Sequence, residues 1–339
     1  MKNNDKVFIA AEIGINHNGD ISLAKEMIEA AKNCGVDAVK FQNYKTEDFI
    51  LDRQIEYTYQ SQGKSITETQ YEMFKRYELS FDQLSELKEY CDSIGVTFFS
   101  TPTSKEGIAE LIKLNVQLIK NGSDFLQNLP FIEELAKSQI PIVISTGMAN
   151  LAQIDDAVRV FEQAGGKDLT ILQCVSQYPT PLEEVNLLKL PVLKNAFGYP
   201  IGFSDHTEGN EAAIGAVTLG ARFIEKHFTL SHHLPGPDHR FSSTPSELLF
   251  YVNSIRNIEK ALGSKTLKPT LSDQKSAEKF QLSCVAKSSL NQSHVLTEND
   301  IAFSRPGNGL PPKMKKSLVG KTLKKAKSAG AKFNFDDFI

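Results

Sequence analysis

The sequence has no run of the about 20 consecutive apolar residues that a membrane-spanning helix needs. Its first apolar run, residues 7–11, is interrupted by Glu12, so it does not predict a signal peptide. Cysteine is also scarce: the four cysteines are Cys34, Cys91, Cys174 and Cys284, and no two form a Cys-x-x-Cys pair. This cysteine usage excludes a disulfide framework and predicts free thiols in a cytoplasmic protein. Because no apolar run is long enough to span a membrane, we also expect no membrane partner.

Aromatic residues are missing from the lysine-rich stretch 313–332. Residues 284–339 contain ten Lys/Arg and four Asp/Glu, a balance of +6, so the rest of the chain, whose total is −3, must carry −9. A basic segment of this kind meets an anionic ligand or an acidic surface, or simply forms a solvated face. No aromatic side chains are interleaved between Lys313 and Lys332 for base stacking, so we expect no nucleic acid partner.

Apolar runs of strand length alternate with helical patterns over most of the chain. The eight runs are residues 7–14, 36–42, 96–101, 117–122, 140–146, 169–175, 201–205 and 223–227. The clearest helical patterns are residues 22–34, 80–94, 150–164, 211–219 and 244–262. Buried strands that alternate with helices are typical of parallel sheets. Eight such units predict a closed (β/α)8 TIM barrel. An open doubly wound sheet is the alternative, which the absence of Gly-x-Gly-x-x-Gly after the first run disfavours.

The polar stretches divide the chain. We expect a catalytic barrel domain over residues 1–263, a linker over 264–283, and a small, mostly β domain over 284–339. The connection 43–79 is long for a barrel loop and contains a helical pattern at 67–76. Long loops of this kind are often lids or binding loops.

Polar side chains follow the strands at the point where each strand ends. In chain order they are Glu12, Lys40 with Gln42, Thr101, Lys120 with Ser123, Ser145, Ser176 with Tyr178, Ser204, and Glu225 with His227. The carboxyl ends of barrel strands share one mouth, so these side chains should gather there. Two lysines and several hydroxyls suit a phosphate or carboxylate ligand.

His206 and His227 lie 21 residues apart, and the helical pattern 211–219 lies between them. A strand, a helix and a parallel strand need about this spacing, so we expect the two imidazoles side by side. A lone histidine in an apolar strand is usually a core residue. A neighbouring pair favours a divalent metal, with positions left open for substrate oxygens and water.

The other histidines are less informative. We expect His232, His233 and His239 to be exposed in the loop after the last strand, and His17 to belong either to a polar loop or to the mouth. Asp238, in the proline-rich stretch of that loop, either binds substrate hydroxyls or forms a simple turn.

Several short motifs occur together in one order. They are Ala11-Glu-Ile-Gly-Ile-Asn-His-Asn-Gly19, Val39-Lys-Phe-Gln42, Phe99-Ser-Thr-Pro102, Ile144-Ser-Thr-Gly-Met148, Tyr178-Pro-Thr-Pro181, Phe203-Ser-Asp-His206, Ile224-Glu-Lys-His-Phe228, Pro235-Gly-Pro-Asp238 and Arg305-Pro-Gly-Asn-Gly309. This series resembles the bacterial sialic acid (nonulosonic acid) synthases over essentially the whole chain. The last motif resembles their C-terminal antifreeze-like (SAF) domain.

The resemblance implies a reaction. Phosphoenolpyruvate would condense with the open-chain aldehyde of an N-acylated hexosamine, either N-acetylmannosamine or a 2,4-diacetamido-trideoxyhexose. Phosphate would leave, and a nine-carbon 2-keto acid would form. A divalent ion, Mn²⁺ or Mg²⁺, would polarise the aldehyde and activate water.

The resemblance also implies roles for the motif residues. The metal ligands would be His206 and His227. Glu12 would act near the metal, either in acid–base catalysis or in positioning water. Phosphoenolpyruvate would be held by Lys40, Thr101, Lys120, Ser123, Ser145 and Ser204, and the sugar would face Gln42, Tyr178 and Asp238. The family's domain-swapped homodimers imply that Arg305 of the partner subunit reaches the N-acyl group.

One position departs from the family pattern. A second carboxylate, proposed for proton transfer, usually stands where this chain has Phe125. Asp124 is adjacent, but neighbouring side chains on a strand point to opposite faces, so only a loop or bulge would let Asp124 replace it. Ser176 and Gln173 also differ from common family residues and would tune the sugar pocket.

Three hypotheses remain open at this point. The first is an active synthase. The second is a metal- and anion-binding paralogue with little catalysis because of Phe125. The third is another phosphoenolpyruvate-dependent barrel aldolase that takes a phosphorylated aldose, an alternative disfavoured by the antifreeze-like tail.

Overall fold

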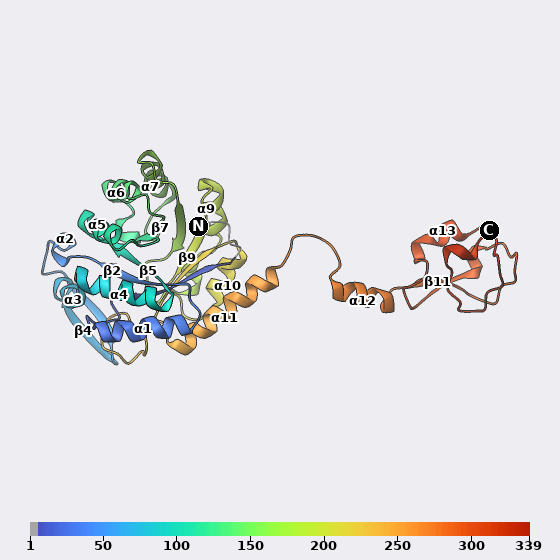
Figure 1. The fold of residues 1–339 in the computed structure, drawn as a ribbon, viewed down its shortest axis with the longest axis horizontal. Helices are drawn as coiled ribbons and strands as arrows, with labels where there is room; N and C mark the ends of the chain where they lie inside the picture. Colours follow the sequence, from blue (N-terminus) through green and yellow to red (C-terminus); the bar gives the residue numbers. More distant parts are fainter. Residues whose placement is uncertain (1–5) are drawn as a thin grey trace. The chain divides into compact units, whose positions relative to one another are not determined.

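The computed structural model describes residues 6–339. The chain divides into two compact units, Met1–Gly263 and Ser264–Ile339, and each has its own hydrophobic core. Figure 1 shows the helices that surround the strands of the first unit. No helix within residues 6–339 is both long and apolar enough to cross a membrane. All four cysteines are buried free thiols.

The first unit is a closed barrel of eight parallel strands, in the order β1-β10-β9-β8-β7-β6-β5-β2. The strands are β1 (Phe8–Gly14), β2 (Ala38–Asn43), β5 (Thr97–Pro102), β6 (Ile119–Asn121), β7 (Ile142–Ser145), β8 (Leu169–Cys174), β9 (Ile201–Asp205) and β10 (Phe223–His227). The predicted (β/α)8 barrel is therefore confirmed, and the open-sheet alternative is wrong.

The helices begin and end where short polar residues and glycines allow it. The side chain of Asp20 caps α1 (Ile21–Asn33), and Ser80 forms a capping box with Gln83 at α4 (Phe81–Ile94). Gly95 ends α4 at φ 76°, a left-handed conformation that favours glycine. The remaining helices of this unit that follow α4 are α5 (Lys105–Lys113), α6 (Leu129–Lys137), α7 (Leu151–Gln163), α8 (Leu182–Val185), α9 (Lys189–Phe197), α10 (Glu211–Thr218) and α11 (Pro245–Leu262).

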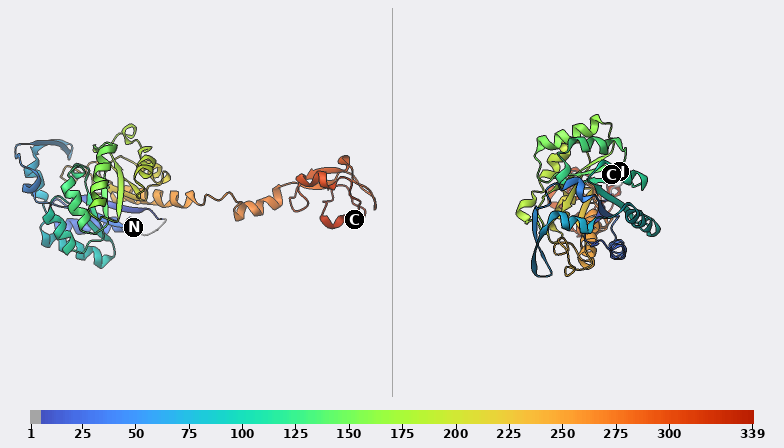
Figure 2. Two further views of the ribbon diagram at one scale, coloured as in Figure 1. Left: turned by 90° about the horizontal axis from the view of Figure 1, so that it is seen from above. Right: turned by 90° about the vertical axis from the view of Figure 1, so that its left-hand side faces the viewer.

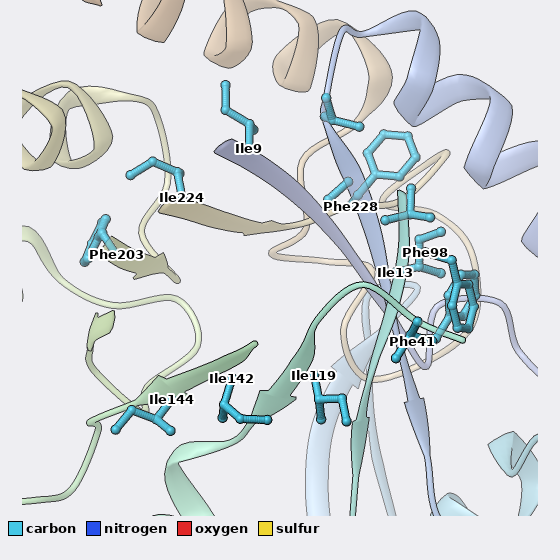
Figure 3. Close-up of a cluster of buried hydrophobic side chains, with 14 of the residues drawn as sticks. Ile9, Ile13, Phe41, Phe98, Ile119, Ile142, Ile144, Phe203, Ile224 and Phe228 are labelled. Carbon is cyan, nitrogen blue, oxygen red and sulfur yellow. The ribbon is translucent and has the colours of Figure 1, made fainter. Parts of the chain in front are cut away.

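Strand residues alternate between two cores because successive side chains of a strand point to opposite faces. One set packs outward against the helices; Figure 3 shows members of it, including Ile9, Phe203 and Ile224. The other set is a smaller cluster made of Ala10, Ala38, Phe99, Leu118, Val143, Leu172 and Phe223. The residues two positions further along each of these strands, toward its carboxyl end, share the face of this second set.

The long connection after β2 is more structured than the sequence suggested. It contains α2 (Thr46–Phe49), an antiparallel hairpin of β3 (Glu56–Ser61) and β4 (Lys64–Thr69), and α3 (Gln70–Tyr77). The predicted helix at 67–76 is therefore wrong at its start. Thr67 and Thr69 pair with β3, and the Thr69 side chain then caps α3 by accepting from the Glu72 amide. In Figure 2 the blue hairpin stands out from the body of the barrel unit.

The second unit is small and mostly irregular. It contains α12 (Leu271–Phe280), an antiparallel pair of β11 (Ser283–Ala286) and β12 (Ile301–Ser304), and α13 (Lys315–Leu318). Its core is built around Phe333, which is fully buried. The short strands fall where β-like segments were expected, and α12 lies in the stretch expected to be a linker.

Candidate active site

A single cavity of about 410 Å³ lies among the residues at the carboxyl ends of the barrel strands. Fourteen of the fifteen site residues predicted from the sequence line it: Glu12, Lys40, Gln42, Thr101, Lys120, Ser123, Asp124, Ser145, Ser176, Tyr178, Ser204, His206, His227 and Asp238. The strand alternation explains this gathering. Glu12, Lys40 and Lys120 lie two residues beyond Ala10, Ala38 and Leu118 of the second core, so they face the same side.

Two lysines and two glutamates form a buried network in this cavity. Lys40 Nζ lies 2.9 Å from Glu12 Oε1 and 4.0 Å from Glu225 Oε2. Lys120 Nζ lies 3.5 Å from Glu225 Oε1, which also accepts a hydrogen bond of 3.0 Å from Ser204 Oγ. None of the four charged side chains is more than 5% exposed. Buried charges of this kind persist only when they are paired.

The two glutamates differ in their readiness to hold a proton. Burial raises the pKa of Glu12 to about 7, because the neighbouring Lys40 ammonium only partly offsets it and the Glu225 carboxylate adds to it. Burial also acts on Glu225, but Lys120 and Lys40 together outweigh it and hold the pKa of Glu225 below its usual range. Glu225 is therefore the permanent anion, and Glu12 is the group able to exchange a proton near neutral pH.

Several polar atoms at the cavity have no partner in the protein. Among the described residues, the hydroxyls of Ser145 and Thr103 and the Oε2 atoms of Glu12 and Glu225 are buried without a hydrogen bond. Lys40 also donates to the Thr101 hydroxyl at 3.0 Å. Buried polar groups are normally satisfied, so these atoms point to a polar ligand.

The two histidines lie side by side, as the strand spacing predicted. Their ring centroids are 5.4 Å apart, and strands β9 and β10 pair in register up to Asp205 and Lys226, directly before them. The Nδ1–H of His206 donates to the Val175 carbonyl at 2.7 Å, which leaves Nε2 as the basic nitrogen. Burial and the neighbouring His206 hold the pKa of His227 well below its usual value, so this ring is neutral.

These two rings suit a divalent metal. His227 Nδ1 is buried without a hydrogen-bond partner and lies 3.9 Å from Asp238 Oδ2. A neutral imidazole with an unused nitrogen, and a second one oriented by a backbone carbonyl, are typical of metal ligands. Within residues 6–339 no group of three or more His, Cys, Asp or Glu side chains could hold a metal.

Asp124 and Phe125 both line the cavity. They belong to a short 3-10 helix, η1 (Ser123–Phe125), that follows the three-residue strand β6. Strand alternation therefore does not apply to them, and the condition for Asp124 to face the cavity is met. Phe125 also packs against Phe131, with ring centroids 5.5 Å apart.

One side of the cavity is bounded by Tyr178 and the loop after β10. Tyr178 lies on His206, with ring centroids 4.1 Å apart, and contacts Phe241 at 5.2 Å. Burial raises the pKa of Asp238 to about 6. The turn of the β3–β4 hairpin holds this loop, because the Gly236 amide donates to Ser61 Oγ at 3.1 Å and Gln62 Nε2 donates to the His233 carbonyl at 2.9 Å.

Arg305 does not line this cavity. It lies in the second unit, where its Nε donates to the Phe280 carbonyl at 3.0 Å and its guanidinium stands 5.4 Å from the centroid of the Phe280 ring. Its proposed contact with the sugar stays a prediction.

The expectation for His239 is wrong, because this side chain is only 1% exposed and contacts the Thr229 hydroxyl. His17 is also buried, and its Nδ1 accepts from the Gly19 amide at 3.0 Å without lining the cavity.

Some lining residues were not assigned a role from the sequence. Glu225, expected at the mouth but given no role, lines the cavity, and the strand alternation could also have found Thr103 and Cys174, which lie two residues beyond Thr101 and Leu172. A second group comes from the connection 43–79 and is mostly aromatic or apolar: Tyr44, Phe49, Tyr57, Gln70, Met73 and Phe74. No local pattern marks this group, because its members meet only through tertiary packing.

An eight-stranded barrel with a cavity lined by polar and charged side chains at the carboxyl ends of its strands is the architecture of TIM-barrel enzymes. The chain belongs to the NeuB family, whose model matches residues 27–267. The predicted resemblance to nonulosonic acid synthases is thereby confirmed.

Similar individual proteins are consistent with this family membership. An uncharacterized protein of Methanocaldococcus jannaschii is 41% identical over 99% of this chain and 95% of its own length. The N,N'-diacetyllegionaminic acid synthase of Campylobacter jejuni is 38% identical over 94% of this chain and 96% of its own. The crystal structure of an N-acetylneuraminic acid synthetase from Leptospira borgpetersenii is similar with a TM-score of 0.73 and 32% identity, over 82% of this chain and 94% of that one.

Proposed function

We propose that this chain condenses phosphoenolpyruvate with an N-acylated hexosamine to give a nine-carbon 2-keto sugar acid and phosphate. The observation that carries the proposal is the buried Lys40–Glu12–Glu225–Lys120 network beside two neighbouring imidazoles in one cavity. Membership of the NeuB family and the names of the relatives support it.

Phosphoenolpyruvate would bind at the lysines. Lys40 and Lys120 supply the positive charge that its phosphate and carboxylate require. The hydroxyls of Thr101, Ser123, Ser145 and Ser204 would add hydrogen bonds at the same end of the cavity. The unpartnered Ser145 hydroxyl would gain a partner on binding.

In the reaction, C3 of phosphoenolpyruvate forms a bond to the aldehyde carbon, the aldehyde oxygen takes up a proton, water adds at C2, and phosphate leaves. Glu12 is the group suited to take a proton from that water, because burial already raises its pKa. Asp124 stands at the cavity as a second carboxyl able to move a proton, while Gln42, Ser176, Tyr178 and Asp238 would orient the sugar.

His206 and His227 would hold a divalent ion, Mn²⁺ or Mg²⁺. When bound, such an ion supplies Lewis acidity at the aldehyde and lowers the pKa of water. The role of the protein is to keep His227 neutral through burial and to orient His206 through its hydrogen bond to the Val175 carbonyl.

The second unit is proposed to be an antiparallel-strand SAF domain that acts across a domain-swapped homodimer, with Arg305 of the partner subunit at the N-acyl group. Mixed dimers test this. An Arg305→Ala chain and a Lys120→Met chain, each weakly active alone, should regain activity when they are co-expressed. Activity that does not recover in the mixture would contradict sharing across subunits.

Purified protein, Mn²⁺, phosphoenolpyruvate and a panel of N-acylated hexosamines test the reaction. Phosphate release should depend on both substrates, and the product mass should equal the sum of the substrates and water minus phosphate. Lys120→Met should weaken phosphoenolpyruvate binding by about 10- to 100-fold in calorimetry, because it removes a charge-assisted contact of about 1.5–3 kcal/mol. No phosphate release with any sugar of the panel would overturn the proposal.

A further inference from the structure

The two histidines come together at the end of β9, and the ladder between β9 and β10 does not reach that far. The last paired residues of the two strands are Asp205 and Lys226. His206 is the next residue and lies beyond the end of β9, whereas His227 still pairs with Glu12 of β1. Main-chain pairing between β9 and β10 therefore does not by itself fix His206 against His227.

Asp205 and Lys226 form a buried ion pair on the outer side of the barrel wall. Successive strand residues point to opposite faces, so these side chains point away from the cavity that the two histidines line. Lys226 Nζ lies 3.2 Å from Asp205 Oδ2, and the two side chains are 3% and 0% exposed. Tyr251 of α11 is also buried, and its hydroxyl donates to the same Oδ2 atom at 2.8 Å. The centroid of its ring lies 5.2 Å from Lys226 Nζ.

The same two charged side chains hold the backbone on the far side of His206. Asp205 Oδ1 accepts hydrogen bonds from the amide and the hydroxyl of Thr207, at 2.8 and 2.7 Å. Lys226 Nζ donates to the Thr207 carbonyl. His206 thus lies between two residues, Asp205 and Thr207, that are both tied to Lys226, the residue directly before His227.

Stability alone does not account for this ion pair. Removing two charges from water costs free energy, and apolar residues of similar volume often stabilise a fold as well as a buried ion pair does. What apolar residues would not supply is the set of directional contacts that joins the end of β9 to the end of β10.

We propose that Asp205, Lys226 and Tyr251 are positioning residues that set the separation of the His206 and His227 imidazoles, and so the affinity of this pair for a divalent cation. The inference rests on the proposed function, because it requires an ion at the two histidines. None of the three side chains lines the cavity, so each acts only through the histidines. Side chains that hold metal ligands from behind usually change metal affinity by about 10- to 100-fold.

The affinity for Mn²⁺ alone tests the proposal, with the free ion measured by electron paramagnetic resonance. Lys226→Met should raise the dissociation constant for Mn²⁺ by about 10- to 100-fold. Tyr251→Phe removes one of the four hydrogen bonds that Asp205 accepts and should raise it by a smaller factor. The dissociation constant for phosphoenolpyruvate, measured by calorimetry without metal, should not change, because Lys40 and Lys120 are untouched.

Two further variants separate positioning from folding. Arg256→Met is the matched control, because it breaks a partly buried ion pair of the same helix, in which Arg256 Nη2 lies 2.6 Å from Asp37 Oδ2. Arg256 also donates to the carbonyl of Val7, directly before β1, so this pair lies at the amino ends of the strands. Arg256→Met should lower the Tm and leave the affinity for Mn²⁺ unchanged.

The double variant Asp205→Asn/Lys226→Met removes both charges, so no buried carboxylate is left unpaired. Its Tm should exceed that of Lys226→Met, while its affinity for Mn²⁺ should stay weak. This variant and Tyr251→Phe carry the test if Lys226→Met does not fold.

Unchanged affinity for Mn²⁺ in Tyr251→Phe and the double variant, or an equal loss in Arg256→Met, would overturn the inference. Binding of Mn²⁺ by the wild type without phosphate release would remove the proposed function but leave the inference standing. No binding of Mn²⁺ by the wild type would overturn the inference together with the metal role in the proposed function.

Discussion

Asp124 and Phe125 are consecutive residues of η1, and both side chains border the cavity. Phe125 has a packing role, since its ring lies against Phe131. Asp124 brings the carboxyl that the family pattern has one residue later. The substitution to Phe125 therefore does not remove the carboxyl from this part of the cavity, which argues against an impaired paralogue.

Asp124→Asn should lower kcat by about 10²–10⁴-fold, the usual loss of a general acid or base. Phe125→Glu should not raise kcat, because a carboxyl is already present and the contact with Phe131 would be lost. Steady-state kinetics with both substrates check these outcomes, and Asp124→Glu serves as the control that keeps the carboxyl. A rise in kcat in Phe125→Glu would show that Asp124 does not replace the missing group.

The buried side chain of His17 should make the free energy of unfolding depend on pH. Burial lowers its pKa to about 4, from 6.5 in a solvated side chain. The unfolded state therefore binds more protons than the folded state between pH 4 and 6.5, so the contribution of His17 is complete above pH 6.5 and is lost as the pH falls toward 4.

The stability of the wild type should thus fall relative to His17→Asn by up to about 3 kcal/mol as the pH is lowered from 7 to 4. Asn preserves an acceptor for the Gly19 amide. Urea unfolding of both proteins across this range measures the difference in their free energies of unfolding. Asp238 and Glu12 are present in both proteins, so their opposite contribution to the pH dependence cancels in this difference. His239→Asn is a second instance, since burial lowers the pKa of His239 to about 4 as well. A constant difference between wild type and variant would contradict the prediction.

At the scale of elements, the β3–β4 hairpin and the loop after β10 act as one unit at the cavity. Ser61 Oγ, at the turn of the hairpin, accepts a hydrogen bond from the Gly236 amide. Gly236 lies two residues before Asp238. Asp238 is thereby positioned by a segment far away in the sequence.

Ser61→Ala should raise the KM for the sugar by about tenfold and leave the KM for phosphoenolpyruvate unchanged. The substitution leaves the buried Gly236 N–H without its acceptor, which costs about 1–3 kcal/mol and loosens the loop that carries Asp238. Thr58→Ala is the matched control, because its hydroxyl pairs only with Thr67 on the exposed part of the same hairpin. An equal effect of both substitutions on the sugar KM would indicate general weakening of the hairpin instead.

The same hairpin marks the limit of prediction at this scale. The barrel strands were predictable because each is a buried apolar run followed by a helix. The hairpin was not, because β3 (Glu56–Ser61) and β4 (Lys64–Thr69) are polar and mostly exposed, so they lack the apolar periodicity that identifies a strand.

At the scale of the whole molecule, the two units have separate cores and should lose structure separately. Phe333 is fully buried in the second core, so Phe333→Ala should destabilise that unit by about 3–5 kcal/mol. Hydrogen exchange followed by mass spectrometry should show faster exchange in residues 284–339 and unchanged protection in the barrel strands. Phe335→Ala is the control, since Phe335 is 68% exposed. Faster exchange in both units would show that they fold as one.

The sequence alone determined the barrel, the polar ring at its mouth and the histidine pair. These features depend on local apolar runs, on the two-residue alternation of strands and on the spacing between neighbouring strands. Only the tertiary structure decided which glutamate is able to hold a proton, how Asp124 reaches the cavity, and that aromatic side chains of the connection 43–79 line it. Each of those properties arises from burial and from contacts between residues distant in the chain, which no local pattern contains.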